Sequence, residues 1–193
     1  SEVVTPDAEG VAVQRLPRGA VVFRDGRVLE IGPAAELHRR HPDARPLNAA
    51  GRLVTPGFVD AHTHMIFAGE RSAELQRRLA GESYAAIAAS GGGIVSTMAA
   101  TAQERDDALE KTLAARLERW RAAGCTTVEV KSGYGLTPGA ELRLLDLMRG
   151  AVQRVPGRVQ RTAQLLHALP PAWTGGREAY SRAMADEVVP EIA

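Results

Sequence analysis

Residues 55–64, TPGFVDAHTH, constrain the fold most, because they predict a β-strand that closes on two histidines. Side chains alternate along a strand, so residues two apart share a face. We therefore expect both imidazoles on one face and a helix packed on the other. The first face would carry Phe58, Asp60, His62 and His64, and the second Val59, Ala61 and Thr63.

The two histidines of this strand are candidate metal ligands. Imidazoles at positions i and i+2 can converge on one ion, and neutral imidazole binds zinc and similar metals. The Pro-Gly entry and the apolar strand favour ligation by His62 and His64 over ordinary core or surface histidines. A catalytic zinc site usually takes three protein ligands, so this pair alone is insufficient. Asp60 is interpreted as a residue that orients a ligand or braces the strand end, not as a ligand.

The N-terminal section predicts part of a small β domain. Residues 1–18 show little pattern. The dipeptide Asp25-Gly26 lies between two short apolar runs and favours a hairpin, because both turn residues need positive φ. We further expect a short helix over residues 34–41 and extended chain over residues 47–54.

Two helices are expected after the histidines. Residues 82–89 predict a short helix that ends at Ser90 and three glycines, which form either a flexible stop or a loop beside a substrate. The clearest helix begins at Thr101, where Thr101 and Glu104 match a capping box, and closes at Gly124. Its core-facing stripe is Leu109, Leu113, Leu117 and Trp120.

Strands and helices then alternate, which indicates βα units and a parallel sheet. Residues 126–131 predict a strand with an apolar face, Val128 and Val130, and a polar face, Thr127, Glu129 and Lys131. The next helix starts at Thr137-Pro138, and its apolar side is Leu142, Leu145 and Met148. A strand over residues 159–166 is expected to deliver His167, and Thr174 to cap a last helix over about residues 176–189.

Composition excludes several classes of partner. The net charge is +1 and the arginines are scattered, which argues against nucleic acid and against a membrane surface. We expect no apolar run long enough for a membrane span, about 18 residues, and no signal peptide. The single Cys125 cannot form an internal disulfide and is interpreted as a small buried thiol. These features predict a cytoplasmic protein.

Five stretches together carry a resemblance to a known family: PGFVDAHTH (56–64), FAGER (67–71), GGGIVST (91–97), KSGYGL (131–136) and HALP (167–170). The first resembles the first barrel strand of the amidohydrolase superfamily of metal-dependent hydrolases. In this order, all five are similar to the imidazolonepropionase family, which acts in histidine degradation. The match runs from about Gly19 to the end of the chain.

The resemblance implies an α/β fold, namely the N-terminal portion of a (β/α)8 TIM-type barrel preceded by part of a small β-sandwich. The expected division is residues 1–52 for the sandwich part and residues 53–193 for the barrel part. A complete barrel needs about 250 residues, so the barrel is expected to be incomplete in this chain.

The resemblance also implies roles for single residues. Arg71 would bind a propionate tail, although by sequence alone an ion pair with Glu70 or Glu74 is the simpler interpretation. Tyr134 would contact an imidazolone ring and His167 the substrate or product; the alternatives are a loop aromatic and a strand end. His62 and His64 would hold one divalent metal, zinc or iron, and the catalytic groups are expected beyond Ala193.

Lys131 is left open between a carboxylated, metal-bridging lysine, as in binuclear relatives, and an ion pair with Glu129. The sequence context resembles the mononuclear type. The implied reaction is hydrolysis of 4-imidazolone-5-propanoate to N-formimino-L-glutamate. One alternative is another cyclic amidohydrolase of the hydantoinase or dihydroorotase kind. A second is a non-catalytic fragment that needs a partner or a missing half. The expected ligand is a small molecule, and a homodimer is left open.

Overall fold

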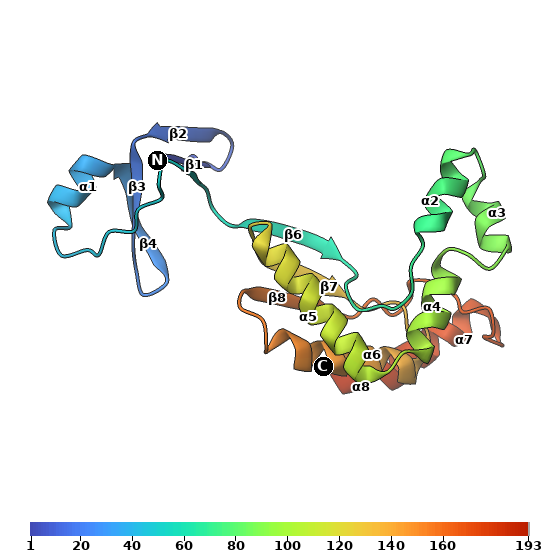
Figure 1. The fold of residues 1–193 in the computed structure, drawn as a ribbon. Coiled ribbons are helices and arrows are strands. Elements are labelled where there is room, and N and C mark those ends of the chain that lie inside the picture. The colour runs from blue at the N-terminus through green and yellow to red at the C-terminus, as the bar shows by residue number, and fades with distance from the viewer. Residues whose placement is uncertain (193) are drawn as a thin grey trace. The chain divides into compact units, whose positions relative to one another are not determined.

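The computed structural model describes residues 1–192 and divides the chain into two units, Ser1–Gly57 and Phe58–Ala193 (Figure 1). The first unit contains two small sheets and one helix. In the first sheet, β1 (Glu2–Pro6) pairs antiparallel with β2 (Val13–Pro17) and parallel with β5 (Leu53–Val54). The second sheet is the antiparallel hairpin of β3 (Gly19–Arg24) and β4 (Arg27–Pro33), and α1 (Ala34–Arg40) follows it.

The predicted hairpin is confirmed. Asp25 and Gly26 connect β3 to β4 with φ angles of 51° and 73°, the positive values that a tight two-residue turn needs. The predicted helix is also confirmed, since α1 begins at Ala34 and His41 is its C-terminal cap. Local turn and helix signals were therefore sufficient for this part of the unit.

The first two strands of the first unit, β1 and β2, were not predicted. Residues 1–18 contain β1 and β2, which are joined by a turn in which the Asp7 carboxylate accepts the Val11 and Ala12 N–H groups. Strand β2 is largely exposed and so shows no alternation of apolar and polar residues. The extended segment expected over residues 47–54 forms a strand only at Leu53–Val54.

The second unit is built on a parallel sheet in the order β6-β7-β8, with ranges Phe58–Thr63, Cys125–Lys131 and Arg158–Thr162. Four helices connect β6 to β7: α2 (Ser72–Leu79), α3 (Tyr84–Ala89), α4 (Ile94–Gln103) and α5 (Asp106–Ala122). Helix α6 (Pro138–Val152) connects β7 to β8, and α7 (Gly176–Ala183), the π-helix η1 (Met184–Val188) and α8 (Val189–Ile192) follow. The predicted βα alternation and parallel pairing are thus confirmed, and the unit is mixed α/β.

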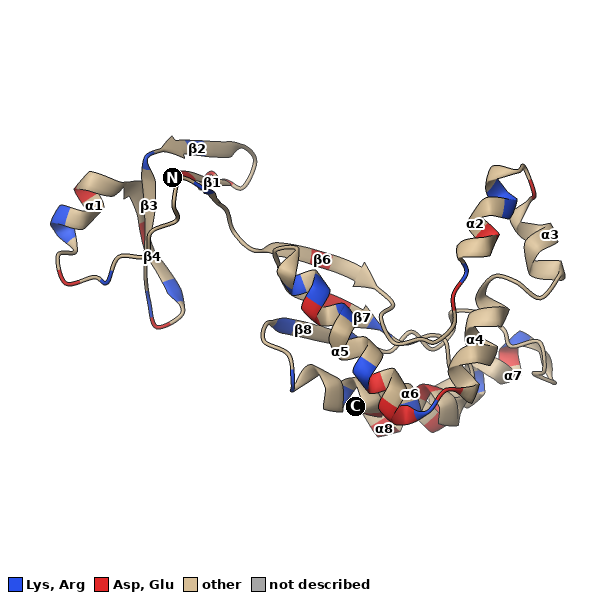
Figure 2. Ribbon diagram, in the orientation of Figure 1, with Lys and Arg blue, Asp and Glu red and all other residues tan. Residues whose placement is uncertain are grey.

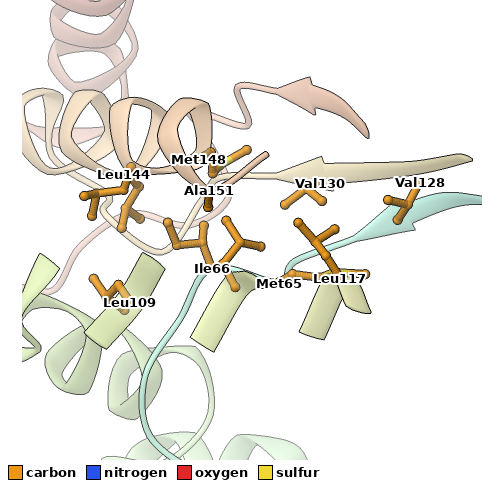
Figure 3. Packing of buried hydrophobic residues seen from close by; sticks show 11 residues of the cluster. Met65, Ile66, Leu109, Leu117, Val128, Val130, Leu144, Met148 and Ala151 are labelled. Atoms are coloured by element: carbon orange, nitrogen blue, oxygen red, sulfur yellow. The ribbon is translucent and has the colours of Figure 1, made fainter. Parts of the chain in front are cut away.

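The main core lies between the sheet and the helices α5 and α6 (Figure 3). Three leucines of α5, Leu109, Leu113 and Leu117, are buried in it as predicted, whereas Trp120 keeps 37% of its surface exposed. The valines of β7 meet α6 residues and the chain that leaves β6; these residues are Val128, Val130, Leu144, Leu147, Met148, Ala151, Met65 and Ile66.

The predicted start of α5 was wrong. Thr101 does not cap this helix but lies inside α4, where it is buried. Its hydroxyl donates to the Thr97 carbonyl at 2.7 Å and accepts the Ala68 N–H at 3.0 Å. Helix α5 begins at Asp106 after Arg105. A threonine hydroxyl can bond either a helix start or the carbonyl four residues back, and the capping-box pattern does not distinguish them.

The apolar side of α6 was only partly predicted. Met148 lies in the main core, but Leu144 and Leu147 are buried beside it instead of Leu142. Leu142 packs on a second cluster formed by Tyr180, Met184 and Val188, and Leu145 touches both clusters. The helix therefore buries two sides, so a single stripe does not describe it.

Four further differences from the predictions concern α2, β8, α7 and α3. Helix α2 was missed, and β8 ends at Thr162, well before Leu166. Thr174 does not cap the last helix; Gly175, with φ of 98°, precedes α7 instead. Helix α3 starts two residues later than expected, because the Ser83 hydroxyl caps it by accepting the Ala86 N–H.

One apolar stretch contradicts the expectation that no run approaches membrane-spanning length. Tyr84–Gln103 is 20 residues long and apolar enough to cross a membrane by length and composition. It is not one continuous helix, because α3 and α4 are separated at Gly91 and Gly93, which have φ angles of 85° and 69°. Elsewhere, acidic and basic residues are interspersed along α5 (Figure 2), and Arg121 pairs with Glu118.

Candidate functional site

The candidate site begins at the carboxyl end of β6, where the predicted facing of side chains was wrong. Strand β6 has a bulge between Asp60 and Thr63. Three residue steps along β6 there match only two steps along β7, from Val128 to Val130. A bulge resets the alternation of faces. Asp60 consequently turns toward α5 and accepts a hydrogen bond from Trp120 Nε1 at 2.6 Å, and Val59, expected under a helix, is 67% exposed.

His62 and His64 remain close to each other despite the bulge. Their ring centroids are 5.4 Å apart, and His64 lies directly after the last residue of β6. Burial, with the charge of His167 as a second cause, lowers the pKa of His64 to about 4. His64 is therefore neutral at pH 7, which is the form of imidazole that binds metals.

The histidine pair fits part of a metal centre. The Nδ1 atom of His64 is buried and has no hydrogen-bond partner within residues 1–192. Over the same residues, no three side chains of the types His, Cys, Asp or Glu gather in a metal-binding group. A catalytic metal needs about three protein ligands. The described residues thus offer two imidazoles and no third ligand.

Rings from three segments meet beside His64. The His167 ring stacks on the His64 ring with centroids 4.7 Å apart and an angle of 12°. The Tyr134 ring lies 5.3 Å from His64 and 5.6 Å from His167, and Phe67 lies 5.8 Å from Tyr134. These residues follow β6, β7 and β8, whose carboxyl ends share one edge of the parallel sheet.

His167 is held by the loop that follows β7. His167 was predicted to end a strand, but it lies in a bend beyond Thr162, the last residue of β8. Its Nδ1 atom lies 2.9 Å from the Gly133 carbonyl oxygen. A carbonyl oxygen only accepts, so His167 carries its proton on Nδ1 and its Nε2 is left as an acceptor when the ring is neutral.

Arg71 contacts Glu74, one of the two ion-pair partners that the sequence suggested. Its Nε atom lies 3.4 Å from the Glu74 carboxylate, whose other oxygen accepts the Gly93 N–H at 2.7 Å. Burial raises the pKa of Tyr134, and the charges of Arg71 and Arg116 act in the opposite direction. The Arg71 charge therefore acts on the phenol of Tyr134.

Lys131 forms the ion pair that was one of the two interpretations. Its Nζ atom donates to Glu129 Oε1 at 2.9 Å, and the Thr162 hydroxyl donates to the same oxygen at 2.7 Å. These two hydrogen bonds are the main causes that lower the pKa of Glu129, and the charge of His62 adds to them. The polar face of β7 is thus a bonded network close to His62.

Arg116 on α5 was missed. Its guanidinium donates to the carbonyl oxygens of Met65 and Phe67 at 2.6 and 2.9 Å and lies 3.6 Å from the centre of the Phe67 ring. It therefore shapes the segment that follows His64. The sequence signal that could have indicated Arg116 is its place directly before Leu117, among the buried leucines of α5.

The contact between Gly133 and His167 gives a direct test of this geometry. Gly133 has φ of 113°, and an added Cβ would lie 2.8 Å from His167 Nδ1. We expect Gly133→Ala to destabilise the second unit by about 1–3 kcal/mol and to separate the His64 and His167 rings. Gly139→Ala is the matched control, since its Cβ would meet no atom within 4 Å. Denaturant titration and ring-to-ring NOEs measure both effects, and equal behaviour of the two variants would contradict the geometry.

Comparisons with known proteins agree with the resemblance carried by the motifs. Residues 19–44 match the family model described as the imidazolonepropionase-like composite domain of bacteria. The imidazolonepropionase of Yersinia enterocolitica is 41% identical over 92% of this chain and 44% of its own length. Those of Symbiobacterium thermophilum and Acidiphilium cryptum are 44% and 45% identical, over 92% and 97% of this chain and 43% and 46% of theirs.

The chain therefore spans less than half the length of these relatives. Among solved structures, a mutant of the atrazine chlorohydrolase TrzN from Arthrobacter aurescens TC1, complexed with zinc and atraton, aligns with a TM-score of 0.46 at 15% identity. That alignment covers 83% of this chain and 33% of the other.

Proposed function

We propose that this chain, which is similar to imidazolonepropionases over nearly its whole length, carries the first part of the active site of a hydrolase of that kind. The reaction is hydrolysis of 4-imidazolone-5-propanoate to N-formimino-L-glutamate. The observation that supports it best is the meeting of His64, Tyr134 and His167 at one edge of the parallel sheet.

In this proposal His62 and His64 hold one divalent metal, zinc or iron, together with ligands outside residues 1–192. The neutral state of His64 and its buried, unpartnered Nδ1 support this role. When bound, such a metal supplies hydroxide at neutral pH, because it lowers the pKa of its water to about 7. The groups that move protons to and from the substrate are proposed to lie beyond Ala193.

The substrate contacts are assigned to three residues. Arg71 binds the propionate tail by exchanging its contact with Glu74 for the substrate carboxylate, which a guanidinium can hold through two hydrogen bonds. Tyr134 packs on the imidazolone ring and offers its hydroxyl. His167, with its proton on Nδ1, presents Nε2 as an acceptor for a ring N–H. Together they hold the ring carbonyl toward the histidine pair.

The fold assignments follow the same reasoning. We assign the second unit to the first part of a (β/α)8 barrel and the first unit to part of a β-sandwich. The polypeptide is taken to act in the cytoplasm on a small molecule. A homodimer is consistent with this assignment.

Turnover of three substrates tests the function. Because the proposed metal centre has only His62 and His64 as ligands within residues 1–192, we expect the 193-residue chain to show no appreciable hydrolysis of 4-imidazolone-5-propanoate. A protein of the length of its relatives, loaded with zinc or iron, should hydrolyse this substrate and neither hydantoin nor dihydroorotate. Ordinary turnover by the 193-residue chain would refute the two-ligand account. Turnover of hydantoin or dihydroorotate instead would support the alternative cyclic amidohydrolase.

Substitution of Arg71 tests most directly which residue binds the propionate. In the active protein of the length of the relatives, we expect Arg71→Met to raise KM by about tenfold or more with a smaller change in kcat. The substitution removes the hydrogen bonds to the charged propionate of the substrate. Arg78→Met is the control, because Arg78 is an exposed arginine on α2, the helix that begins directly after Arg71. An unchanged KM in the Arg71 variant would assign the propionate to another residue.

A further inference from the structure

Glu141 has an unusual environment for a carboxylate. It lies in the first turn of α6 and is fully buried. One oxygen accepts the N–H groups of Gly135 and Leu136, both at 2.8 Å, and the other accepts the N–H of Gly133 at 3.0 Å. All three donors belong to the loop after β7 that carries Tyr134.

Burying a carboxylate is costly unless hydrogen bonds replace its water. Here three backbone N–H groups do so, and the start of α6 adds the favourable end of the helix dipole. A glutamate is not needed merely to begin this helix, because the Thr137 hydroxyl already caps it by accepting the Ala140 N–H. The carboxylate is therefore matched to the loop and not to the helix end.

The loop has a conformation that its sequence alone does not favour. Leu136 has φ of 56°, a value that leucine rarely adopts. At Gly135, an added Cβ would lie 2.6 Å from backbone atoms of Ala140 and Glu141, so the loop runs tightly against α6. The bonds to Glu141 hold both residues in place.

The same bonds reach the candidate site. Tyr134 lies between Gly133 and Gly135, both of which donate to Glu141. The carbonyl oxygen of Gly133 in turn accepts from His167 Nδ1 at 2.9 Å. The Glu141 carboxylate thus bonds both neighbours of Tyr134, and one of these neighbours, Gly133, also bonds His167.

We propose that Glu141 is a positioning residue that fixes Tyr134 and, through Gly133, His167 against His64. Its importance for binding the substrate rests on the proposed function, but its effect on the geometry of the rings does not. The alternative is that Glu141 has a purely structural role and contributes only to the stability of the second unit. The two are separated by whether the rings move while the fold remains intact.

The unmodified chain gives the first test. In hydrogen exchange followed by NMR, we expect the amides of Gly133, Gly135 and Leu136 to be protected to a similar degree as those in the middle of α6, because they bond a buried carboxylate. Exchange at the rate of an exposed loop would overturn the proposal without any substitution.

Variants give the second test. Glu141→Gln preserves volume and replaces one acceptor oxygen by a donor, and Glu141→Ala removes both oxygens. We expect NOEs from the Tyr134 ring to the His64 and His167 rings to be lost in either variant, while methyl NOEs within the main core persist. Glu110→Gln is the control, since Glu110 is a half-buried carboxylate on α5 that pairs with Arg154 and not with the loop. Glu141→Gln decides the result if Glu141→Ala does not fold, and unchanged ring NOEs in Glu141→Gln would overturn the proposal.

A ligand titration separates this proposal from the proposed function. Imidazole-4-propionate has the ring and tail of the proposed substrate without its carbonyl. We expect the unmodified chain to bind it and Glu141→Gln to bind it about tenfold more weakly, whereas Glu110→Gln should not differ. No binding by the unmodified chain would count against the assigned substrate, and the ring NOEs would still decide the role of Glu141.

Discussion

Leu113→Ala is expected to destabilise the second unit by about 3 kcal/mol, because it leaves a cavity at a fully buried position of the main core. Leu113 lies on α5 with core leucines one turn before and after it, so the surrounding side chains cannot easily fill the space. Urea denaturation followed by tryptophan fluorescence measures the change. Both tryptophans, Trp120 and Trp173, belong to the second unit, so the signal reports on that unit.

Leu79→Ala is the matched control for this prediction. Leu79 closes α2 and keeps 79% of its surface exposed, so its truncation should change the free energy of unfolding by less than about 0.5 kcal/mol. Equal effects of the two substitutions would mean that the packing of α5 against the sheet is not the main source of stability.

Arg116→Met is expected to destabilise the second unit by about 2 kcal/mol and to loosen the segment after His64. The substitution keeps an apolar chain of similar length but removes the donors to the Met65 and Phe67 carbonyls, which are left without those partners. It also removes the contact between the guanidinium and the Phe67 ring. We expect the amides of residues 65–68 to lose protection from hydrogen exchange.

Arg119→Met serves as its control, because Arg119 is an exposed arginine on the same helix. It should leave both the free energy of unfolding and the exchange of residues 65–68 unchanged. If Arg116→Met changed stability but not the exchange of these amides, its role would be confined to packing.

Periodic and turn signals were enough for much of the fold. The Asp25-Gly26 turn, the leucines of α5 and the valine face of β7 all follow from local chemistry, since backbone dihedral preference and helical or strand periodicity act over a few residues. The helix boundaries were less predictable. Thr101 satisfied a capping pattern, yet its hydroxyl has better partners inside α4, which the pattern does not contain.

The candidate site shows the same division. The sequence by itself determined its components: histidines at a strand end, an arginine after them, a glycine-bracketed tyrosine and a later histidine. Parallel strand pairing then makes their meeting at one edge of the sheet an expected result. The roles of these residues in binding metal and substrate stay predictions.

Only the tertiary structure decided how these residues are held. The bulge in β6 turned Asp60 to Trp120, and neither residue signals this in the sequence, because a bulge depends on how two distant strands pair. Arg116 and Glu141 bond backbone groups of other segments, and such contacts leave no local pattern. The sequence thus determined which chemical groups are present and which strands carry them, whereas long-range hydrogen bonding and packing determined their orientation.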